Sequence, residues 1–330
     1  MKTDMSAVRR SRDDQLKFSK EEITANKAFW TGEHPRIELP PENPWPSNGH
    51  WDTHLVSTEE IVVDSVAHMT PHWDQMAPYN VYCPLKSWSS TVHVPAGCVA
   101  VAGAEVLYYL HYKIGVPEVA FGTFYMDGDI PVYGGGSAVN WDLMDPDYQS
   151  YGPADKEAIL IRRVGDFSTM TYADTASSAL FANLRTSAFP AHNISCSQRL
   201  YNQDTVKRHL DNRFPILVAA NEQLLFGDGH CFVIDGFKKT RIKSTYLNIF
   251  ITEDFGFQGL EPYETVSYTS PEITAIKINW GWWDQWDPYN LNDGWYTLTG
   301  DWSTVDIYDN ETSYNYYRKI IYDFKPTDEP

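Results

Sequence analysis

A change of pattern at Pro215 limits the possible folds of this chain more than any other feature of the sequence. Before this proline, apolar residues recur at helical spacing. The predicted helices cover residues 98–113, 153–164, 175–185 and 203–212. After it, short apolar runs typical of strands, separated by turn residues such as Asp235-Gly236, cover 216–220, 231–234, 246–250, 274–279, 295–298 and 319–324. Helices followed by strands favour an α+β fold with an antiparallel sheet.

The N-terminal part of the chain is organised differently. Ser19 and Glu22 form a capping-box pattern, which predicts a short helix through about Phe29. Five prolines between residues 35 and 46 then favour an extended run. Because globular patterning begins near Val62, we expect residues 1–62 to be a lead-in and residues 63–330 to form one domain.

Charge and hydropathy argue against two classes of partner. The chain has 26 basic and 44 acidic residues, so its formal net charge of -18 disfavours binding to nucleic acid or to an anionic membrane. The most apolar stretch, residues 97–110, is interrupted by Glu105 and is too short for a transmembrane segment. The first six residues lack the features of a signal peptide, so we expect the protein to be intracellular or to have lost a leader.

Cys98 lies where the loop at 94–97 is predicted to become a helix. The dipole at a helix N-terminus stabilises a thiolate, which is the nucleophilic form of cysteine. The alternative is a small buried residue in an Ala/Val-rich helix. A nucleophilic Cys98 must be free, so Cys83, Cys196 and Cys231 allow at most one disulfide.

A cysteine nucleophile needs a base, which is usually a histidine from another part of the fold. His230 differs from the other nine histidines because it starts an apolar strand directly after a glycine-containing loop. Side chains alternate along a strand, so a His230 that faces a cleft turns Cys231 toward the core. Further along, Asn279 or the indole of Trp280 can fix the imidazole ring, although a Trp-rich core strand is the alternative.

These segments together resemble the streptopain-like cysteine peptidases, the C10 peptidase family, which have a papain-like fold. The family's Gly-Cys-Val-Ala run is matched by Gly97–Ala100, its Gly-His-x-Phe-Val-Ile-Asp-Gly run by Gly229–Gly236, and its Asn-Trp-Gly-Trp run by Asn279–Trp282. All three occur in the family's order. The segment His72–Asn80 is similar to the one that contains the family's oxyanion-hole glutamine. The resemblance runs from about residue 65 to the end.

The resemblance implies a cysteine endopeptidase without a cofactor, whose helical half carries Cys98 and whose antiparallel sheet carries His230. The Cys98 thiolate would attack the scissile carbonyl to form an acyl-enzyme, with His230 as its imidazolium partner. The Cys98 N–H and the Gln75 amide would hold the oxyanion. Asn279 and Trp280 would orient or shield His230.

The resemblance also implies partners, a location and substrate-binding residues. The partners would be protein or peptide substrates, and an inhibitory pro-segment, of which residues 1–62 are a remnant, or an inhibitor protein. The location would be secreted or in the cell envelope of a bacterium, with the leader absent from this chain. The implied substrate-binding residues are Met170, Tyr172, Ser177, Ser178, Gly229 and Trp282.

One segment departs from the family's pattern. Trp283-Asp284 replaces a glycine pair, and residues 285–292 resemble an insertion that we expect to narrow the cleft. The alternative function is therefore a surface adhesion or a glycan- or protein-binding protein that keeps the fold while catalysis is restricted.

Two histidine pairs raise the question of a metal. They are His50 with His54, and His68 with His72. Neither has a third ligand at motif spacing, and Pro71 interrupts any helix through the second pair. We therefore expect no metal site.

Overall fold

The computed structural model describes residues 49–87, 89–116, 120–127, 130–138, 140–146, 154–224, 229–252, 263–282, 292, 294–305 and 310–327. The helix predicted through Phe29, the proline-rich run and residues 283–291 lie outside these ranges. The chain divides into two compact units, one built mainly from Val66–Phe237 and Ile276–Pro330 and the other including Lys238–Ala275.

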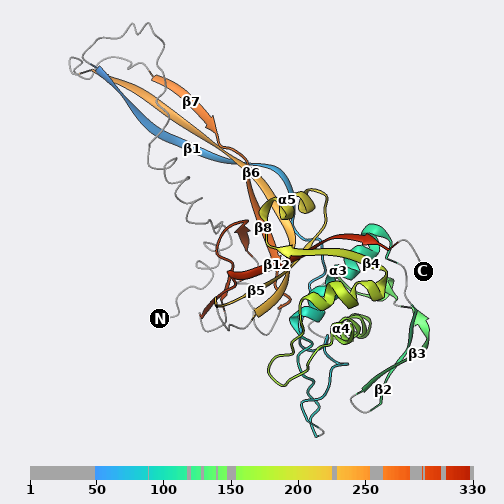
Figure 1. Ribbon diagram of the computed structural model, residues 1–330. Helices are drawn as coiled ribbons and strands as arrows, with labels where there is room; N and C mark the ends of the chain where they lie inside the picture. Colours follow the sequence, from blue (N-terminus) through green and yellow to red (C-terminus); the bar gives the residue numbers. More distant parts are fainter. Residues whose placement is uncertain are drawn as a thin grey trace. The chain divides into compact units, whose positions relative to one another are not determined.

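One sheet organises the first unit. Its strands follow one another in the order β4 (Ile194–Leu200), β12 (Tyr316–Pro326), β5 (Ile216–Asn221), β6 (Gly229–Thr252), β8 (Ile273–Asn279) and β9 (Trp295–Thr297) (Figure 1). The pairs β4–β12, β12–β5 and β5–β6 are antiparallel. The predicted α+β class is therefore confirmed, and the arrangement is consistent with a papain-like fold.

In its described residues, the second unit contains a ribbon of three paired strands. There, β6 pairs with β1 (Gly49–Val66) and, in antiparallel register from Lys243 to Ile249, with β7 (Tyr263–Thr269) (Figure 1). Because β1 extends past residue 62, the proposed boundary between residues 1–62 and 63–330 falls inside a strand. That division stays a prediction.

Three of the four predicted helices are confirmed as α3 (Cys98–Ile114), α4 (Asp155–Phe167) and α5 (Gln203–Asp211). The helix predicted over 175–185 is wrong in its bounds, because helical structure starts only at residue 182 and leads into a π-helical turn at Leu184–Ala188. Residues 171–178 instead form a loop, in which Thr171 and Ser178 exchange backbone hydrogen bonds of 2.8 and 3.0 Å. Ser177 Oγ also donates to the Pro95 carbonyl oxygen at 2.5 Å.

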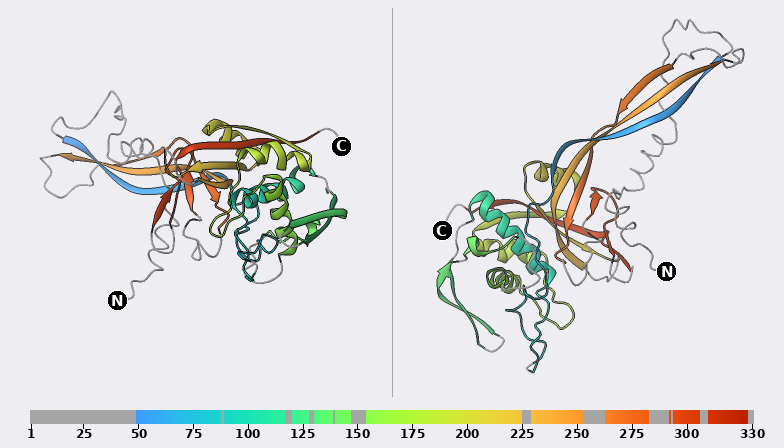
Figure 2. Two further views of the ribbon diagram at one scale, coloured as in Figure 1. Left: turned by 60° about the horizontal axis from the view of Figure 1, so that its bottom comes forward. Right: turned by 180° about the vertical axis from the view of Figure 1, so that it is seen from behind.

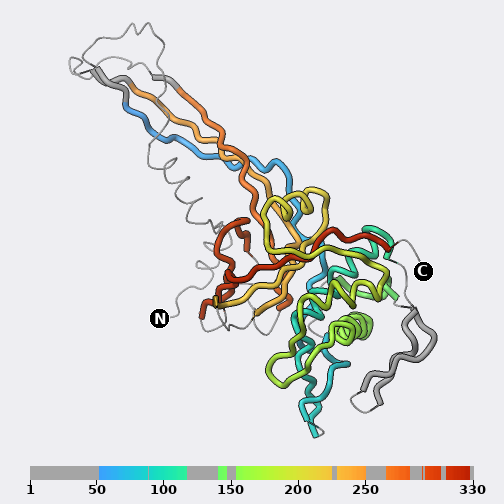
Figure 3. The backbone as a smooth tube through the Cα atoms, viewed as in Figure 1, coloured from blue at the N-terminus to red at the C-terminus, as the bar shows by residue number. Residues whose placement is uncertain are grey.

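The turn predicted at Asp235-Gly236 is also wrong, since β6 continues through it without a break (Figure 3). Gly236 instead allows the backbone of Val66 and Ala67 to pass close to β6. A Cβ on Gly236 would lie 2.3 Å from the Ala67 carbonyl oxygen, so only glycine lets the segment before α3 pass this strand.

The remaining described elements are short. They are β2 (Ala120–Asp127) with β3 (Ile130–Ala138), β10 (Ser303–Val305) with β11 (Glu311–Ser313), and the 3-10 turns Trp141–Leu143 and Pro190–His192. No helix in the described ranges combines the length and the hydropathy that a membrane span requires.

Alternation along the strands divides the core into two layers. Cys231 and Val233 of β6 pack with α3 and α4, whereas Phe232 and Ile234 pack with α5 and the tryptophan-rich strands. Figure 2 shows α3 and α4 together beside the sheet. Cys231 is 2 % exposed, which confirms its predicted place in the core.

Glu105 is a buried carboxyl group at the centre of α3. Its Oε1 accepts the Trp73 N–H at 2.9 Å, which ties the helix to the segment just before Gln75. Burial raises the pKa of Glu105 well above its ordinary value of 4.5, and the Trp73 N–H opposes this shift.

This shift predicts how stability changes with pH. The folded chain holds the Glu105 proton more tightly than the unfolded chain, so the free energy of unfolding falls as pH rises from about 4.5 through the raised pKa. Glu105→Gln keeps a carbonyl acceptor for Trp73 and removes the titration. In urea unfolding, we expect the free energy of unfolding of Glu105→Gln to increase relative to that of the wild type as pH rises. The total increase should be about 1.4 kcal/mol for each unit by which folding raises the Glu105 pKa. The exposed Glu59→Gln is the matched control, and parallel pH profiles for the wild type and Glu105→Gln would contradict the prediction.

Candidate active site

Cys98 is the first residue of α3, and the backbone before it requires glycine. Gly97 has a φ of 91°, which is in the region that side chains disfavour. A Cβ there would lie 2.9 Å from the Met170 Sδ and 3.0 Å from the Ser177 carbonyl oxygen. Cys98 is partly exposed, and it lines a cavity of about 1020 Å³.

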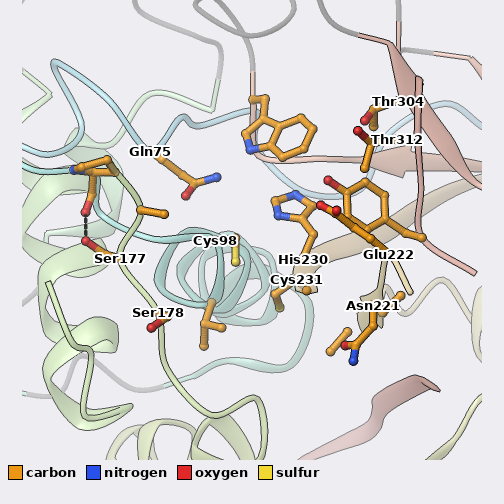
Figure 4. Close-up of a pocket in the computed structure, with 18 of the residues that line it drawn as sticks. Gln75, Cys98, Ser177, Ser178, Asn221, Glu222, His230, Cys231, Thr304 and Thr312 are labelled. Atoms are coloured by element: carbon orange, nitrogen blue, oxygen red, sulfur yellow. Dashed lines mark hydrogen bonds between the residues drawn. The ribbon is translucent and has the colours of Figure 1, made fainter. Parts of the chain in front are cut away.

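His230 faces the same cavity from the start of β6 (Figure 4). Its Nε2–H donates to the Trp280 carbonyl oxygen at 2.7 Å, which leaves Nδ1 as the nitrogen that can accept a proton from a thiol. The Trp282 ring covers the imidazole at a centroid distance of 4.2 Å. Trp280 thus orients His230 through its backbone, and Trp282 shields it.

The side chain of Asn279 is directed elsewhere. Its amide nitrogen donates to the Pro71 carbonyl oxygen at 2.8 Å, and its Oδ1 accepts the Gly281 N–H at 3.0 Å. The structure therefore brings Trp280 to His230, whereas Asn279 fastens the strand end to the segment that leads to Gln75.

Gln75 lies on the side of the cavity nearest the start of α3. Its carbonyl oxygen accepts the Ala96 N–H at 2.8 Å, so its backbone is tied to the loop that ends at Cys98. Figure 4 shows the Gln75 amide, the Cys98 thiol and the His230 ring converging on one space. Three segments that are distant in sequence meet there.

The predicted substrate-binding residues fall into two groups. Ser177, Ser178, Gly229 and Trp282 line the cavity. Met170 and Tyr172 are absent from its lining. Met170 packs beneath Gly97, and the Tyr172 ring lies 4.7 Å from the Arg162 guanidinium.

The cavity also contains residues that the sequence did not reveal. Asn221 ends β5, Glu222 follows it, and Thr304 and Thr312 come from β10 and β11, on the side of His230 away from Cys98 (Figure 4). Each belongs to a segment without a recognisable motif. The pairing of β5 with β6 places Asn221 opposite Gly229, whereas Thr304 and Thr312 reach the cavity from the separate β10–β11 hairpin. Asn292, at the end of the predicted insertion, lines the cavity too and is anchored to Val305 by two hydrogen bonds.

Burial favours the neutral thiol of Cys98 and the neutral imidazole of His230. It raises the pKa of the Cys98 thiol, although backbone N–H groups of Cys231 and Val99 oppose the shift. It lowers the pKa of His230 to about 4, against the hydrogen bond to Trp280. A thiolate here therefore needs the imidazolium as its counter-charge, because transfer of the proton from sulfur to nitrogen leaves the pair without net charge.

A second group of titratable residues lies apart from this pair. His68 Nδ1 is 3.3 Å from Asp235 Oδ2, and His72 Nε2 is 2.8 Å from His68 Nδ1. The sequence offered no third ligand for this histidine pair. The structure supplies Asp235 from β6, and only tertiary folding could reveal that contact.

The chain matches the sequence profile of the peptidase C10 family over residues 73–290, which is more than half of its length. It belongs to this family. Membership makes it a cysteine-type peptidase with protein substrates, as the resemblance implied.

Two solved structures from Prevotella intermedia are similar to this C10 peptidase. Active wild-type interpain A cysteine protease is 20% identical with a TM-score of 0.49, and the match covers 79% of this chain and 95% of that one. A fragment of prointerpain A, residues 39–359 with a C154A mutation, is 20% identical with a TM-score of 0.48, covering 98% and 84%. No curated protein sequence matches the chain.

The electrostatics of the pair predict the effect of removing the imidazole. In His230→Ala the Cys98 thiol keeps a pKa above its ordinary value of 9.0, so its thiolate fraction at pH 7 is below about 1%. We expect alkylation of Cys98 by iodoacetamide to be at least about 100-fold slower than in the wild type at pH 7 and to recover as pH rises past 9. Peptide mapping of the labelled chain measures this rate, and unchanged labelling at pH 7 in a folded variant would contradict the assignment.

Proposed function

We propose that this C10 peptidase is an endopeptidase in which Cys98 is the nucleophile and His230 the acid and base. The observation that carries this proposal is the cavity where Cys98, His230 and Gln75 meet from three separate segments. A thiol, an imidazole and an amide donor are the groups that acyl transfer to sulfur requires.

The reaction proceeds in two stages. The Cys98 proton moves to His230 Nδ1, and the thiolate forms a bond from Sγ to the scissile carbonyl carbon. The imidazolium then returns that proton to the leaving amine as the carbon–nitrogen bond breaks. Water, deprotonated by the same imidazole, attacks the thioester and releases the acid and the free thiol.

Two donors support the developing oxyanion in this proposal. The Cys98 N–H belongs to the first turn of α3, where backbone N–H groups have no partner within the helix. The second donor is the side-chain amide of Gln75, which lies beside the Cys98 thiol (Figure 4). Loss of one such donor costs about 2.7–4 kcal/mol in the transition state of comparable enzymes.

The roles of these residues can be separated by kinetics on a peptide library. Cys98→Ser should abolish cleavage and covalent labelling by an epoxide inhibitor. Gln75→Ala should keep epoxide labelling but lower kcat by about 100- to 1000-fold, since it removes transition-state stabilisation without removing the thiol. Gln203→Ala, an equal truncation at an exposed site on α5, is the matched control and should match the wild type. Cleavage that survives in Cys98→Ser would refute the proposal.

We propose further that residues 1–62 act as an inhibitory pro-segment, or as the remnant of one. The proposal rests on the family resemblance and on the extended, proline-rich composition of this lead-in. A bacterial secreted or cell-envelope location is proposed on the same resemblance.

Truncation tests the inhibitory role. Because β1 begins at Gly49 and pairs with β6, removal of residues 1–48 keeps that strand, whereas removal of 1–62 takes most of it away. We expect the chain without residues 1–48 to cleave the library faster than the full chain, and the separate 1–48 peptide to slow it again. Equal rates for the full and shortened chains, with native melting curves, would contradict this role.

A further inference from the structure

We infer that His68, His72 and Asp235 form a binding site for a divalent metal ion of the zinc class. His68 Nδ1, His72 Nε2 and Asp235 Oδ2 all lie within 4.8 Å of one another, and all three residues belong to the same compact unit. The site is independent of the proposed peptidase mechanism, which uses none of these residues.

The spacing of the donor atoms fits tetrahedral coordination. Zinc binds histidine nitrogen and carboxylate oxygen at about 2.0–2.1 Å, so neighbouring ligand atoms of a tetrahedral site lie about 3.3 Å apart. The three separations here are 2.8 Å between the histidine nitrogens, 3.3 Å from His68 to Asp235 and 3.8 Å from His72 to Asp235. An ion can be accommodated by side-chain shifts of a few tenths of an ångström.

The donor set selects the class of metal. Two imidazoles with one carboxylate suit zinc and neighbouring transition metals, whereas magnesium and calcium prefer all-oxygen sites. The carboxyl group of Asp235 is completely buried, and its Oδ1 has no hydrogen-bond partner among the described residues. A buried carboxylate with one unpaired oxygen is costly unless a cation or water compensates it, and an ion bound at Oδ2 would neutralise its charge.

Surrounding hydrogen bonds orient the ligands. Thr70 Oγ1 donates to Asp235 Oδ2 at 3.1 Å, and the Asn279 amide reaches Thr70 Oγ1 at 3.4 Å and the Pro71 carbonyl oxygen at 2.8 Å. Metal sites depend on such outer contacts to fix their ligands. The histidines are 27 % and 18 % exposed, so an ion can enter from solvent.

The position of the site gives the metal a structural consequence. His72 lies three residues before Gln75, and Asp235 lies on the same strand as His230. A bound ion would fasten the segment that leads to the oxyanion donor to the strand that carries the base. It would act by positioning and would not contact substrate.

The test measures zinc binding by titration calorimetry in the full chain with Cys98→Ser, so that the nucleophilic thiol cannot contribute a ligand. We expect one equivalent of Zn²⁺ to bind, and His68→Ala or His72→Ala in this background to weaken binding by at least about 100-fold, more than loss of an outer contact. His54→Ala, which removes an exposed histidine paired with Asp52, is the matched control and should bind as the parent does.

Thermal melting provides a second readout. Zinc should raise the melting temperature of the Cys98→Ser chain and of the His54→Ala control, EDTA should reverse the rise, and magnesium should have no effect. His68→Gln and His72→Gln serve as further variants if the alanine forms do not fold. Absence of zinc binding in the parent, or equal zinc affinity in folded His68 and His72 variants, would overturn the inference.

Discussion

The alternation of side chains along β6 is the constraint on which the rest of this structure depends. Successive residues of a strand point to opposite faces, so a single segment supplies both layers of the core. Cys231 and Val233 face α3, while Phe232 and Ile234 face the aromatic layer. His230, at the strand's beginning, is thereby held among Trp280, Trp282 and Tyr314 while it still borders the cavity. A slip of one residue would exchange Cys231 for His230 and turn the imidazole away from the cavity.

Much of this arrangement could be predicted from local pattern. The Ala/Val-rich segment after Cys98 and the apolar run after His230 indicate a helix and a strand, and α3 and β6 form there, although β6 extends well beyond the predicted 231–234. The errors arose where tertiary contacts override local preference. Asp235-Gly236 has turn chemistry, yet the glycine is needed because another backbone passes against it. Likewise, residues 175–183 have helical spacing, but Ser177 and Ser178 bond outside the segment.

Long-range contacts in the active site were harder still to anticipate. The sequence suggested that Asn279 or Trp280 orients the histidine, and the structure gives this contact to the backbone carbonyl of Trp280. A backbone contact leaves no trace in residue identity, which explains why the motif alone could not distinguish the two. Glu222, Thr304 and Thr312 were missed for a related reason, because they line the cavity only through the tertiary fold.

The loop beside Cys98 contains one buried, hydrogen-bonded residue and one exposed residue close together in sequence. Ser177 is buried and bonded to Pro95, three residues before Cys98, whereas Leu180 is 73 % exposed and lines the same cavity. Substitutions at the exposed end can therefore change the shape of the surface offered to a polypeptide without disturbing the bond that holds the loop. In the proposed active site, such a loop would let substrate recognition change while Cys98 and His230 stay in place.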